Sequence, residues 1–533
     1  MQLRGLSVAF FSSIVAGGAY YAYTGDGSRH PFNTRDVVTD SPGQQVKTSV
    51  GPSKESIGAH GQADPTLASQ DARSNRRTLV VDNESFYEST LADDEAVCKT
   101  TDDAGRKRLE LMTPEQATEK LRKNEESFLV GRGKGVVRYD VVQLSSNDPI
   151  EDDHAEKVVE VSPVVAPPQE GHAATDWMFW GVFDGHSGWT TSARLRQALI
   201  PFVARELNET HRKAMQNPSS PMPEPSTIDA ALRSAFVQLD NEICIESVRK
   251  LLQNPSRRLG AELLAPAMSG SCALLSFYDT RSKIFRVACT GDSRAVLGRR
   301  NATSGKWMAT QLSEDQTGSN PKEAARMRAE HPGEPDVVRN GRVLGNLEPS
   351  RAFGDAFYKW GRDIQDKINR QFFGRAPHQN LKTPPYVTAE PVVTSTQIDP
   401  SQGDFVVLAT DGLWEMLTNE EVVGLVGQWM EENNASGKRS GNKSWFSSWF
   451  NSENTSLPVE SGGNSGKDGR ANGKPEAPIR QRQWQLNSQN QSRFIVEDKN
   501  AATHLVRNAL GGRDRDMVCA LLTLPSPYSR RYR

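Results

Sequence analysis

Three mostly apolar runs, each ending at an aspartate beside a glycine, stand out in the hydrophobic pattern of the chain. The runs and the residues that follow them are 177–183 before Asp184-Gly185, 283–290 before Gly291-Asp292, and 405–410 before Asp411-Gly412. Their length and their β-branched and aromatic residues predict buried strands, and the Asp-Gly pairs predict turns. We therefore expect three carboxylates at the rims of sheets, each held in place by a strand.

Apolar residues at helical spacing predict several helices around these strands. One predicted helix begins at 114, and the others span 190–208, 228–252, 419–432 and 494–510. Thr113, Pro114 and Gln116 carry the signature of a capping box, with proline at the first helical position. Two further apolar runs, 271–277 and 284–289, predict a hairpin. This alternation favours an α+β fold, in which helices cover antiparallel sheets.

Stretches without periodic apolar residues separate the predicted domain from the start of the chain and interrupt it near its end. Residues 6–23 carry no charge and are just long enough to span a bilayer, which leaves a membrane anchor, a secretory signal or an organellar sorting segment open. Residues 24–110 read as a flexible linker, and 433–490, rich in Gly, Ser, Asn and Lys, as a disordered insertion. We assign the remainder, 111–533, to one domain.

The composition argues against several classes of function. With 64 Lys+Arg against 66 Asp+Glu, the 533-residue chain has a formal net charge of -2, which excludes a basic nucleic-acid footprint. The five cysteines form no C-x-x-C pair, which argues against a zinc site and a disulfide scaffold. An apolar content of 36% indicates that sizeable segments contribute little to a core.

The aspartates at the strand ends suit a particular kind of metal. Carboxylate and backbone carbonyl oxygens are the ligands of hard divalent cations such as Mg²⁺ or Mn²⁺. We hypothesise that Asp184, the carbonyl of Gly185 and Asp411 converge on such a site. His186 follows Gly185 directly and titrates near neutrality, so it is a candidate acid or base, although a structural turn histidine is the alternative.

Four motifs, in this order, carry a resemblance to a known family: FDGHSG, TGDSRAVLG, SRAFGDAFYKW and LATDGLWEML. Together they resemble the metal-dependent serine/threonine phosphatases of type 2C, the PPM family, over roughly residues 120–430. The resemblance implies a four-layer α+β sandwich, in which two facing antiparallel sheets are flanked by helices. It also implies two Mg²⁺ or Mn²⁺ ions in a cleft at one end of the sandwich.

The same resemblance implies roles for individual residues. Asp184 would be shared by both ions, Gly185 and Asp411 would complete their shells, and Asp152 beside Glu151 matches the acidic pair near the metals. His186 would donate a proton to the leaving serine or threonine oxygen. Asp292 would bind a further, weaker ion or orient water, or be structural, and we interpret Asp355 of SRAFGD as structural.

Further stretches, SNDPIEDD, NLEPSRAFGD and TPPYVTAEPVVT, are similar to the family's mitochondrial branch that acts on pyruvate dehydrogenase. This similarity implies a phosphoprotein substrate in the pyruvate dehydrogenase complex, mitochondrial localisation, and an inner-membrane anchor or sorting role for 6–23. Family members end in a strand that supplies another metal ligand, and the resemblance stops just ahead of it, so either the sequence is truncated or incompletely predicted, or the protein lacks this strand and ligand. A catalytically impaired pseudophosphatase, acting as a binding or regulatory module, is therefore the alternative.

Overall fold

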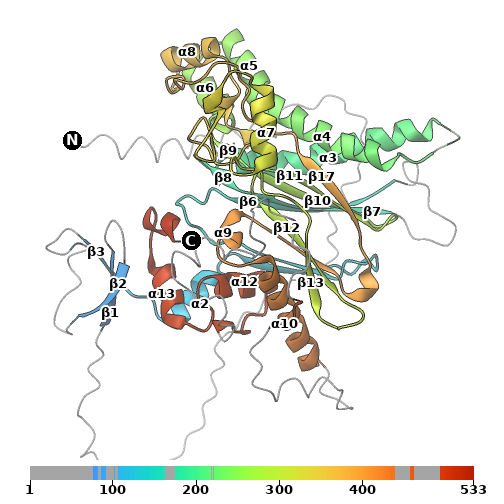
Figure 1. Ribbon diagram of the computed structural model, residues 1–533, viewed down its shortest axis with the longest axis vertical. Coiled ribbons are helices and arrows are strands. Elements are labelled where there is room, and N and C mark those ends of the chain that lie inside the picture. The colour runs from blue at the N-terminus through green and yellow to red at the C-terminus, as the bar shows by residue number, and fades with distance from the viewer. Residues whose placement is uncertain are drawn as a thin grey trace, which may run out of the picture. The chain divides into compact units, whose positions relative to one another are not determined.

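The structure, a computed structural model, describes residues 76–81, 86–91, 101, 106–162, 175–217, 219, 221–437, 457–460 and 493–532 (Figure 1). The chain divides into two compact units. The first unit holds the described residues that fall within 149–423, together with 459–460, and the second holds the remaining described residues. The predicted anchor at 6–23 and most of the 433–490 insertion lie outside the described residues.

A five-stranded antiparallel sheet, in the order β17-β11-β10-β7-β6, forms the centre of the first unit. The strands are β6 (Asp153–Glu160), β7 (Asp176–Phe183), β10 (Ala273–Asp279), β11 (Ile284–Thr290) and β17 (Val392–Gln397). The predicted hairpin is confirmed, because β10 and β11 pair antiparallel with Ala273 opposite Thr290. The predicted strand at 177–183 is β7, which begins one residue earlier.

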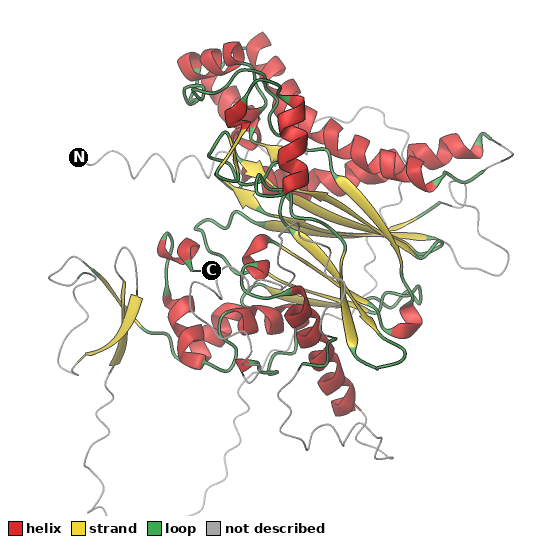
Figure 2. Cartoon of the chain, viewed as in Figure 1, coloured by secondary structure: helices red, strands yellow, loops and turns green. Residues whose placement is uncertain are grey.

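Alternate residues of β7 face opposite sides of this sheet, as strand geometry requires. Trp177, Phe179 and Phe183 belong to the main hydrophobic core. Helices α3 (Thr190–Met215) and α4 (Pro225–Asn241) supply the other side of that core and cover the sheet (Figure 2). Each of these three rings is at most 3% exposed, so the sheet that carries the candidate site rests on a closely packed support.

A second antiparallel sheet, in the order β13-β12-β18, faces the first within the same unit (Figure 1). Its strands are β12 (Arg294–Arg300), β13 (Trp307–Gln311) and β18 (Phe405–Ala409). In the short stretch 457–460, Val459 forms a parallel bridge with Trp307 at the start of β13. Two facing antiparallel sheets with helices outside them confirm the predicted α+β sandwich.

Shorter elements complete the first unit. The strands are β8 (Gly185–His186), β9 (Gly270–Ser271), β14 (Val338–Arg339), β15 (Arg342–Val343) and β16 (Phe353–Gly354). The helices are η1 (Glu242–Glu246), α5 (Ser247–Gln253), α6 (Arg257–Met268), α7 (Pro321–Glu330), η2 (Pro335–Val337), η3 (Ala356–Tyr358), α8 (Arg362–Gln371), η4 (Pro400–Gln402) and α9 (Asp411–Trp414). Helix α10 (Asn419–Gly437) begins in this unit and continues in the second.

The helix predicted at 228–252 is not continuous. A π-helical turn, η1, separates α4 from α5. The indole Nε1 of Trp360 donates a 2.8 Å hydrogen bond to the carbonyl oxygen of Cys244 within this turn. The apolar spacing in the sequence does not show that one backbone carbonyl accepts a hydrogen bond from a residue elsewhere in the fold. The sequence therefore did not predict the interruption.

The second unit has its own small core, which includes Leu79, Leu121 and Leu521. Its elements are β1 (Arg76–Val81), β2 (Phe86–Leu91), β3 (Lys107–Glu110), α2 (Pro114–Arg122), β4 (Glu125–Leu129), β5 (Arg138–Val142), α12 (Ala501–Ala509), α13 (Arg515–Thr523) and η7 (Tyr528–Arg531). The predicted capping box of α2 is confirmed by reciprocal hydrogen bonds between Thr113 and Gln116.

Two predictions are corrected in this unit. Strands β1, β2 and β3 form a three-stranded sheet inside the stretch 24–110 that we predicted as a linker. Their apolar side chains pack on α2 and α13, a contact that local composition does not reveal. The helix predicted at 494–510 is shorter, because Asn500 caps α12 by accepting a hydrogen bond from Thr503 N at 2.9 Å.

The carboxylate of Asp498 anchors the non-helical segment before α12. It is fully buried and accepts hydrogen bonds from Arg507 (2.9 Å) and Arg122 (2.7 Å). Burial alone would raise the pKa of Asp498, but the two guanidinium groups outweigh burial and lower it. The stabilisation that this cluster provides is therefore present at neutral pH and is lost as the pH falls through the lowered pKa.

Replacing Asp498 by asparagine is expected to destabilise the second unit by about 3–5 kcal/mol, because two cations lose their buried counter-charge. Urea unfolding followed by circular dichroism measures the loss. Asp516→Asn is the matched control, because Asp516 pairs with Arg77 but its side chain is 64% exposed. The control is expected to cost under about 1 kcal/mol, and equal losses in the two variants would contradict the prediction.

Among the described residues, no helix is both long enough and apolar enough to cross a bilayer. The segment for which an anchor was predicted, 6–23, is not among those residues, so the anchor stays a prediction.

Candidate metal centre and active site

The topology of the large sheet brings three chain segments to one edge. Strands β7 and β11 both pair antiparallel with β10, so their C-terminal ends point in the same direction. Asp184 follows β7, and Asp292 follows β11 after a single glycine. Strand β6 is antiparallel to β7, with Asp153 opposite Phe183, so Asp152 lies beside the end of β7. Three aspartates therefore meet at this edge.

The smaller sheet adds a fourth aspartate. Strand β12 pairs antiparallel with β18, and Arg294 at the start of β12 lies opposite Ala409 at the end of β18. The chain passes from β11 to β12 through residues 291–293, so the end of β18 lies next to the turn that carries Asp292. Asp411, two residues beyond Ala409, opens α9 at this place.

Asp184, Asp292 and Asp411 form one acidic cluster. One carboxylate oxygen from each lies within 4.8 Å of the other two. Asp152, another predicted ligand, lies beside the cluster and accepts a 3.2 Å hydrogen bond from the N–H of Gly185. The structure thus brings together the aspartates singled out in the sequence, with Asp292 taking a more central place than Asp152.

The cluster strongly disfavours negative charge in the absence of a cation. Burial, followed by the neighbouring carboxylates, raises the pKa of Asp184 and of Asp411 well above the usual range. Burial is also the main cause that raises the pKa of Asp292 and of Asp152 to about 6. A divalent cation would reverse both effects by supplying opposite charge at close range. Oxygen-only ligands in a partly buried acidic cluster therefore fit a hard divalent cation.

Two glycines allow the chain segments to approach this closely. A Cβ atom at Gly185 would meet the backbone oxygen of Glu151 at 2.0 Å, and one at Gly291 would meet Cys272 Sγ at 2.3 Å. Gly291 also has a positive φ of 109°. We expected Gly185 to serve a sharp turn, but its backbone is not left-handed. Glycine is required at position 185 for steric reasons, because the segment that carries Glu151 and Asp152 passes directly over it.

His186 lies on a small sheet of its own, β16-β9-β8, at the same edge. It pairs with Gly270 of β9, which in turn pairs with Gly354 of β16. The Nε2 atom of His186 lies 2.6 Å from Oδ2 of Asp355, the residue after β16. A Cβ atom at Gly270 would lie 2.1 Å from Nε2 and 2.4 Å from Oδ2, so glycine leaves the space for this contact.

The contact with Asp355 sets the protonation of His186. Burial lowers the pKa of His186, but the Asp355 carboxylate outweighs burial, and the net effect is a raised pKa. The imidazole is therefore biased toward the protonated form, which is the form that can donate a proton. The pairing was missed in the sequence, because 169 positions separate the two residues and no local signal connects them.

A buried ion pair supports the loop that carries Asp355. Asp240 of α4 accepts a 2.9 Å hydrogen bond from the N–H of Gly354 and pairs with Lys359 Nζ at 2.6 Å. Lys359 also donates to the carbonyl oxygen of Ala352 at 2.8 Å. The side chains of Asp240 and Lys359 are 10% and 6% exposed. Asp355 itself has a left-handed backbone, with φ 47° and ψ 38°, and these contacts hold it there.

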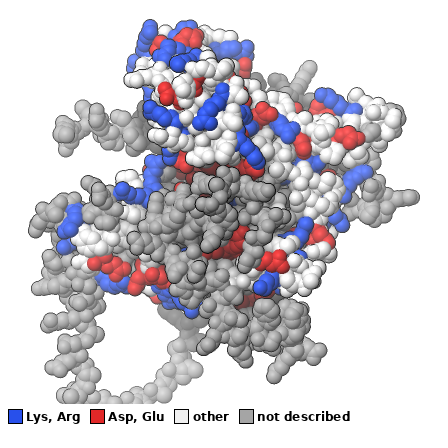
Figure 3. Space-filling view, in the orientation of Figure 1, with Lys and Arg blue, Asp and Glu red and all other residues white. Residues whose placement is uncertain are grey.

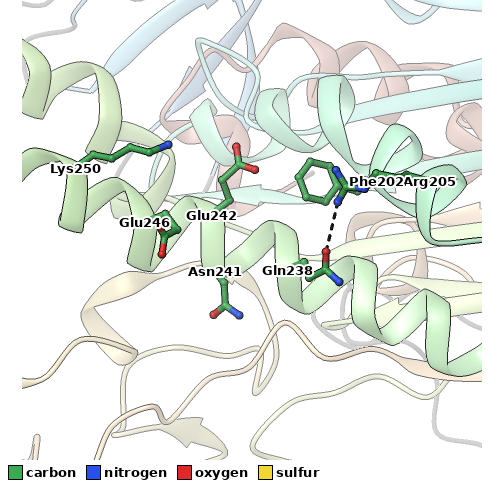
Figure 4. A pocket seen from close by; sticks show the side chains of 7 residues that line it. All are labelled: Phe202, Arg205, Gln238, Asn241, Glu242, Glu246 and Lys250. Carbon is green, nitrogen blue, oxygen red and sulfur yellow. Dashed lines mark hydrogen bonds between the residues drawn. The ribbon is translucent and has the colours of Figure 1, made fainter. Parts of the chain in front are cut away.

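A groove of about 530 Å³ lies on the outer helices of this unit (Figure 4). Its lining consists of Phe202 and Arg205 from α3 and of Gln238, Asn241, Glu242, Glu246 and Lys250 from α4, η1 and α5. None of the cluster residues lines it. The groove is therefore a feature of the helical layer, distinct from the acidic cluster.

Comparison with known proteins agrees with the geometry of the cluster. The sequence profile described as Protein phosphatase 2C matches residues 164–443, which include Asp184, Asp292 and Asp411. The chain belongs to the protein phosphatase 2C family. This phosphatase is therefore a metal-dependent enzyme that acts on phosphoserine or phosphothreonine in proteins, and the predicted family membership is confirmed.

Three curated relatives of this phosphatase cover most of the chain. It is 44% identical over 425 residues (78% of the chain, 70% of the relative) to the Saccharomyces cerevisiae pyruvate dehydrogenase (acetyl-transferring)-phosphatase 1, mitochondrial. It is 42% identical over 417 residues (78% and 82%) to a Schizosaccharomyces pombe protein phosphatase 2C homolog. The Homo sapiens pyruvate dehydrogenase (acetyl-transferring)-phosphatase 1, mitochondrial, is 30% identical over 486 residues (79% and 81%).

Proposed function

We propose that this phosphatase removes phosphate from serine or threonine side chains of the pyruvate dehydrogenase complex in mitochondria, and that it thereby reactivates the complex. The cluster of Asp184, Asp292 and Asp411, in which Asp292 is buried and the other two are partly buried, carries the proposal that the site is catalytic. Identity of 44% to a relative named for pyruvate dehydrogenase and for mitochondria supports the substrate and the compartment. Residues 6–23 would sort the chain to mitochondria or anchor it in the inner membrane.

Two Mg²⁺ or Mn²⁺ ions would be held by Asp184, Asp411, the carbonyl of Gly185, and Asp152, with Asp292 as a further ligand. When bound, the cations would lower the pKa of the attacking water and neutralise charge on the phosphoryl oxygens. The protein's own contribution is to hold these carboxylates close together and largely away from water. Burial at two sheet edges provides this, because the strands that carry the carboxylates cannot move apart without disrupting the core.

His186 would donate the proton that the departing serine or threonine oxygen requires. Its Nε2 atom is held by Asp355 at 2.6 Å, which fixes the ring and favours the protonated form. The imidazolium is regenerated from solvent after each turnover. In this role Asp355 is a positioning residue, since it acts through His186 rather than on the substrate.

Phosphate release from phosphorylated pyruvate dehydrogenase tests the proposal directly. The purified full-length protein is expected to release phosphate with Mg²⁺ or Mn²⁺ and to stop when a chelator is added. An unrelated phosphoprotein at the same concentration is the control for substrate choice. Equal rates on both substrates would contradict the choice of pyruvate dehydrogenase, and no release from either would favour a pseudophosphatase. A fluorescent fusion that stains another compartment would contradict the mitochondrial assignment.

The raised pKa values of the aspartates predict that metal binding depends on pH. A carboxyl group with a raised folded-state pKa favours folding while it is protonated, and that contribution is lost as the pH rises through the raised value. For Asp152 and Asp292 this value is about 6, and for Asp184 and Asp411 it is higher still. The metal-free protein is therefore expected to lose stability as the pH rises from about 4, the ordinary pKa of aspartate, through about 6 and above.

Thermal unfolding with and without Mn²⁺ measures this dependence. Saturating Mn²⁺ is expected to raise Tm by about 5 °C or more at pH 7.5. The increase should fall below about 2 °C at pH 5, because protons then compete for the same oxygens. The Asp292→Asn variant is expected to flatten the pH dependence. A shift of the same size at both pH values would contradict the assignment of these carboxylates as ligands.

A further inference from the structure

The segments that contain helices α5, α6 and α8 carry more positive than negative charge, and several of their cations have no role in the metal centre or in the fold. Residues 246–262 and 362–382 contain nine Lys or Arg and four Asp or Glu, in a chain whose net charge is -2. We call the surface that they form the basic face. Its cations are Arg249, Lys250, Arg257, Arg258, Arg362, Lys367, Arg370, Arg375 and Lys382.

Packing between α5, α6 and the end of α8 brings together the segments that carry these cations. Gly260 of α6 is approached so closely by Phe372 and Phe373 that a Cβ atom there would meet them at 3.1 and 3.4 Å. Leu251 of α5 would also lie 3.5 Å away from this Cβ. The three helices lie together at the top of Figure 1, and Figure 3 shows Lys and Arg side chains there, with Asp and Glu among them.

Several cations of the basic face already have structural tasks. Arg258 pairs with Glu262 at 3.3 Å, and Arg370 pairs with Asp366 at 3.9 Å. Arg362 donates to the carbonyl oxygens of residues 378 and 381, and Arg375 stacks over Phe357. Within the described part of the chain, Lys250, Arg257 and Lys367 are exposed and have no acidic partner.

The basic face lies within reach of the catalytic centre. Arg362, the first residue of α8, follows Asp355 by seven positions and so lies at most about 25 Å from it. Five more helical residues to Lys367 add about 8 Å. An extended peptide of about ten residues spans the same distance. A substrate segment within about ten residues of a phosphoserine at His186 could therefore contact these cations.

We propose that the basic face docks an acidic segment of the phosphoprotein substrate, within about ten residues of the phosphorylated side chain. This inference rests on the proposed function, since the same centre hydrolyses the docked substrate. Unpaired Lys250, Arg257 and Lys367 would meet Asp or Glu side chains, and Phe373, which is 40% exposed, offers an apolar contact among them. Such contacts change encounter and affinity more than the chemical step.

Two phosphoserine peptides of identical length test the docking, one with an acidic segment on each side and one with those acids changed to amides. The wild-type protein is expected to show a KM about five- to tenfold lower for the acidic peptide, with the same kcat. The advantage should shrink in about 300 mM salt, because exposed charges are then screened. Fluorescence anisotropy of a non-hydrolysable acidic peptide measures binding independently of catalysis.

The K250E/R257E/K367E variant is expected to lose the preference and to keep its rate on the neutral peptide. The matched control is R212E/K213E, at the end of α3, where the two cations are 65% and 72% exposed. An equal KM for both peptides in the wild type, or a preference that survives in the triple variant, would overturn the proposal. Loss of binding to anionic vesicles without any change in peptide preference would assign the face to a membrane and also overturn it.

These outcomes separate failure of the docking proposal from failure of the proposed function. If both peptides are hydrolysed equally, the result supports the phosphatase activity and contradicts the docking proposal. If neither is hydrolysed in Mg²⁺ or Mn²⁺, the proposed function falls, and anisotropy still decides whether the basic face binds the acidic peptide. A melting curve for each variant confirms that the substitutions, all at exposed positions, leave the fold intact.

Discussion

Replacing Asp184 by asparagine is expected to lower kcat/KM for a phosphoserine peptide by about 1,000-fold or more, while the metal-free protein becomes more stable. The loss of activity follows because the carboxylate at the centre of the cluster would supply opposite charge to both cations. The gain in stability follows because desolvation, and then repulsion from Asp411, Asp152 and Asp292, raises the pKa of Asp184. A neutral amide removes that repulsion, which should stabilise the metal-free fold by about 1–2 kcal/mol.

Because Asp184→Asn is expected to lower activity but to raise the stability of the metal-free protein, the test separates a lost metal ligand from misfolding. Steady-state kinetics with Mn²⁺ and urea unfolding in chelator measure them on the same preparation. Asp363→Asn, on exposed α8, is the control and should change neither quantity. A variant that is inactive because it misfolds would lose stability as well. Retained activity, or activity that ignores chelator, would remove the metal centre from the mechanism.

Replacing His186 by glutamine is expected to slow hydrolysis of phosphoserine by about 100- to 1,000-fold, but to slow hydrolysis of p-nitrophenyl phosphate by less than about tenfold. A serine oxygen leaves as a strongly basic alkoxide and needs a proton, whereas p-nitrophenolate leaves without one. The loss should therefore depend on the leaving group. A damaged site would instead slow both substrates alike.

Asp355 and Gly270 extend the same prediction. Asp355→Asn is expected to slow hydrolysis of phosphoserine more than that of p-nitrophenyl phosphate, with about a tenth of the rate loss expected for His186→Gln. The reason is that the amide holds the ring but no longer favours its protonated form. Gly270→Ala should do the same, since a Cβ atom would lie 2.1 Å from Nε2 of His186. His154→Gln is the control, because that histidine pairs with Glu156 at 2.9 Å on β6 and has no proposed role in proton transfer.

Local signals in the sequence predicted more of the site than of its surroundings. Asp184 and Asp411 could be singled out because each follows an apolar run that predicts a strand, and each precedes a glycine. The capping box at Thr113 could be identified because both of its partners lie within four residues. By contrast, the short sheet formed by β1, β2 and β3 was predicted as linker, because its apolar residues are few and are buried only by α2 and α13.

The sequence by itself determined the strands that lead to Asp184, Asp292 and Asp411 and the hard-cation character of these ligands, because chain periodicity and oxygen chemistry are local properties. Only the tertiary structure decided that Asp292 stands with Asp184 and Asp411, and that Asp355 holds His186. Those choices depend on which strands pair and on how two sheets face each other. They also depend on glycines at 185, 270 and 291, whose missing Cβ atoms let distant segments come into contact.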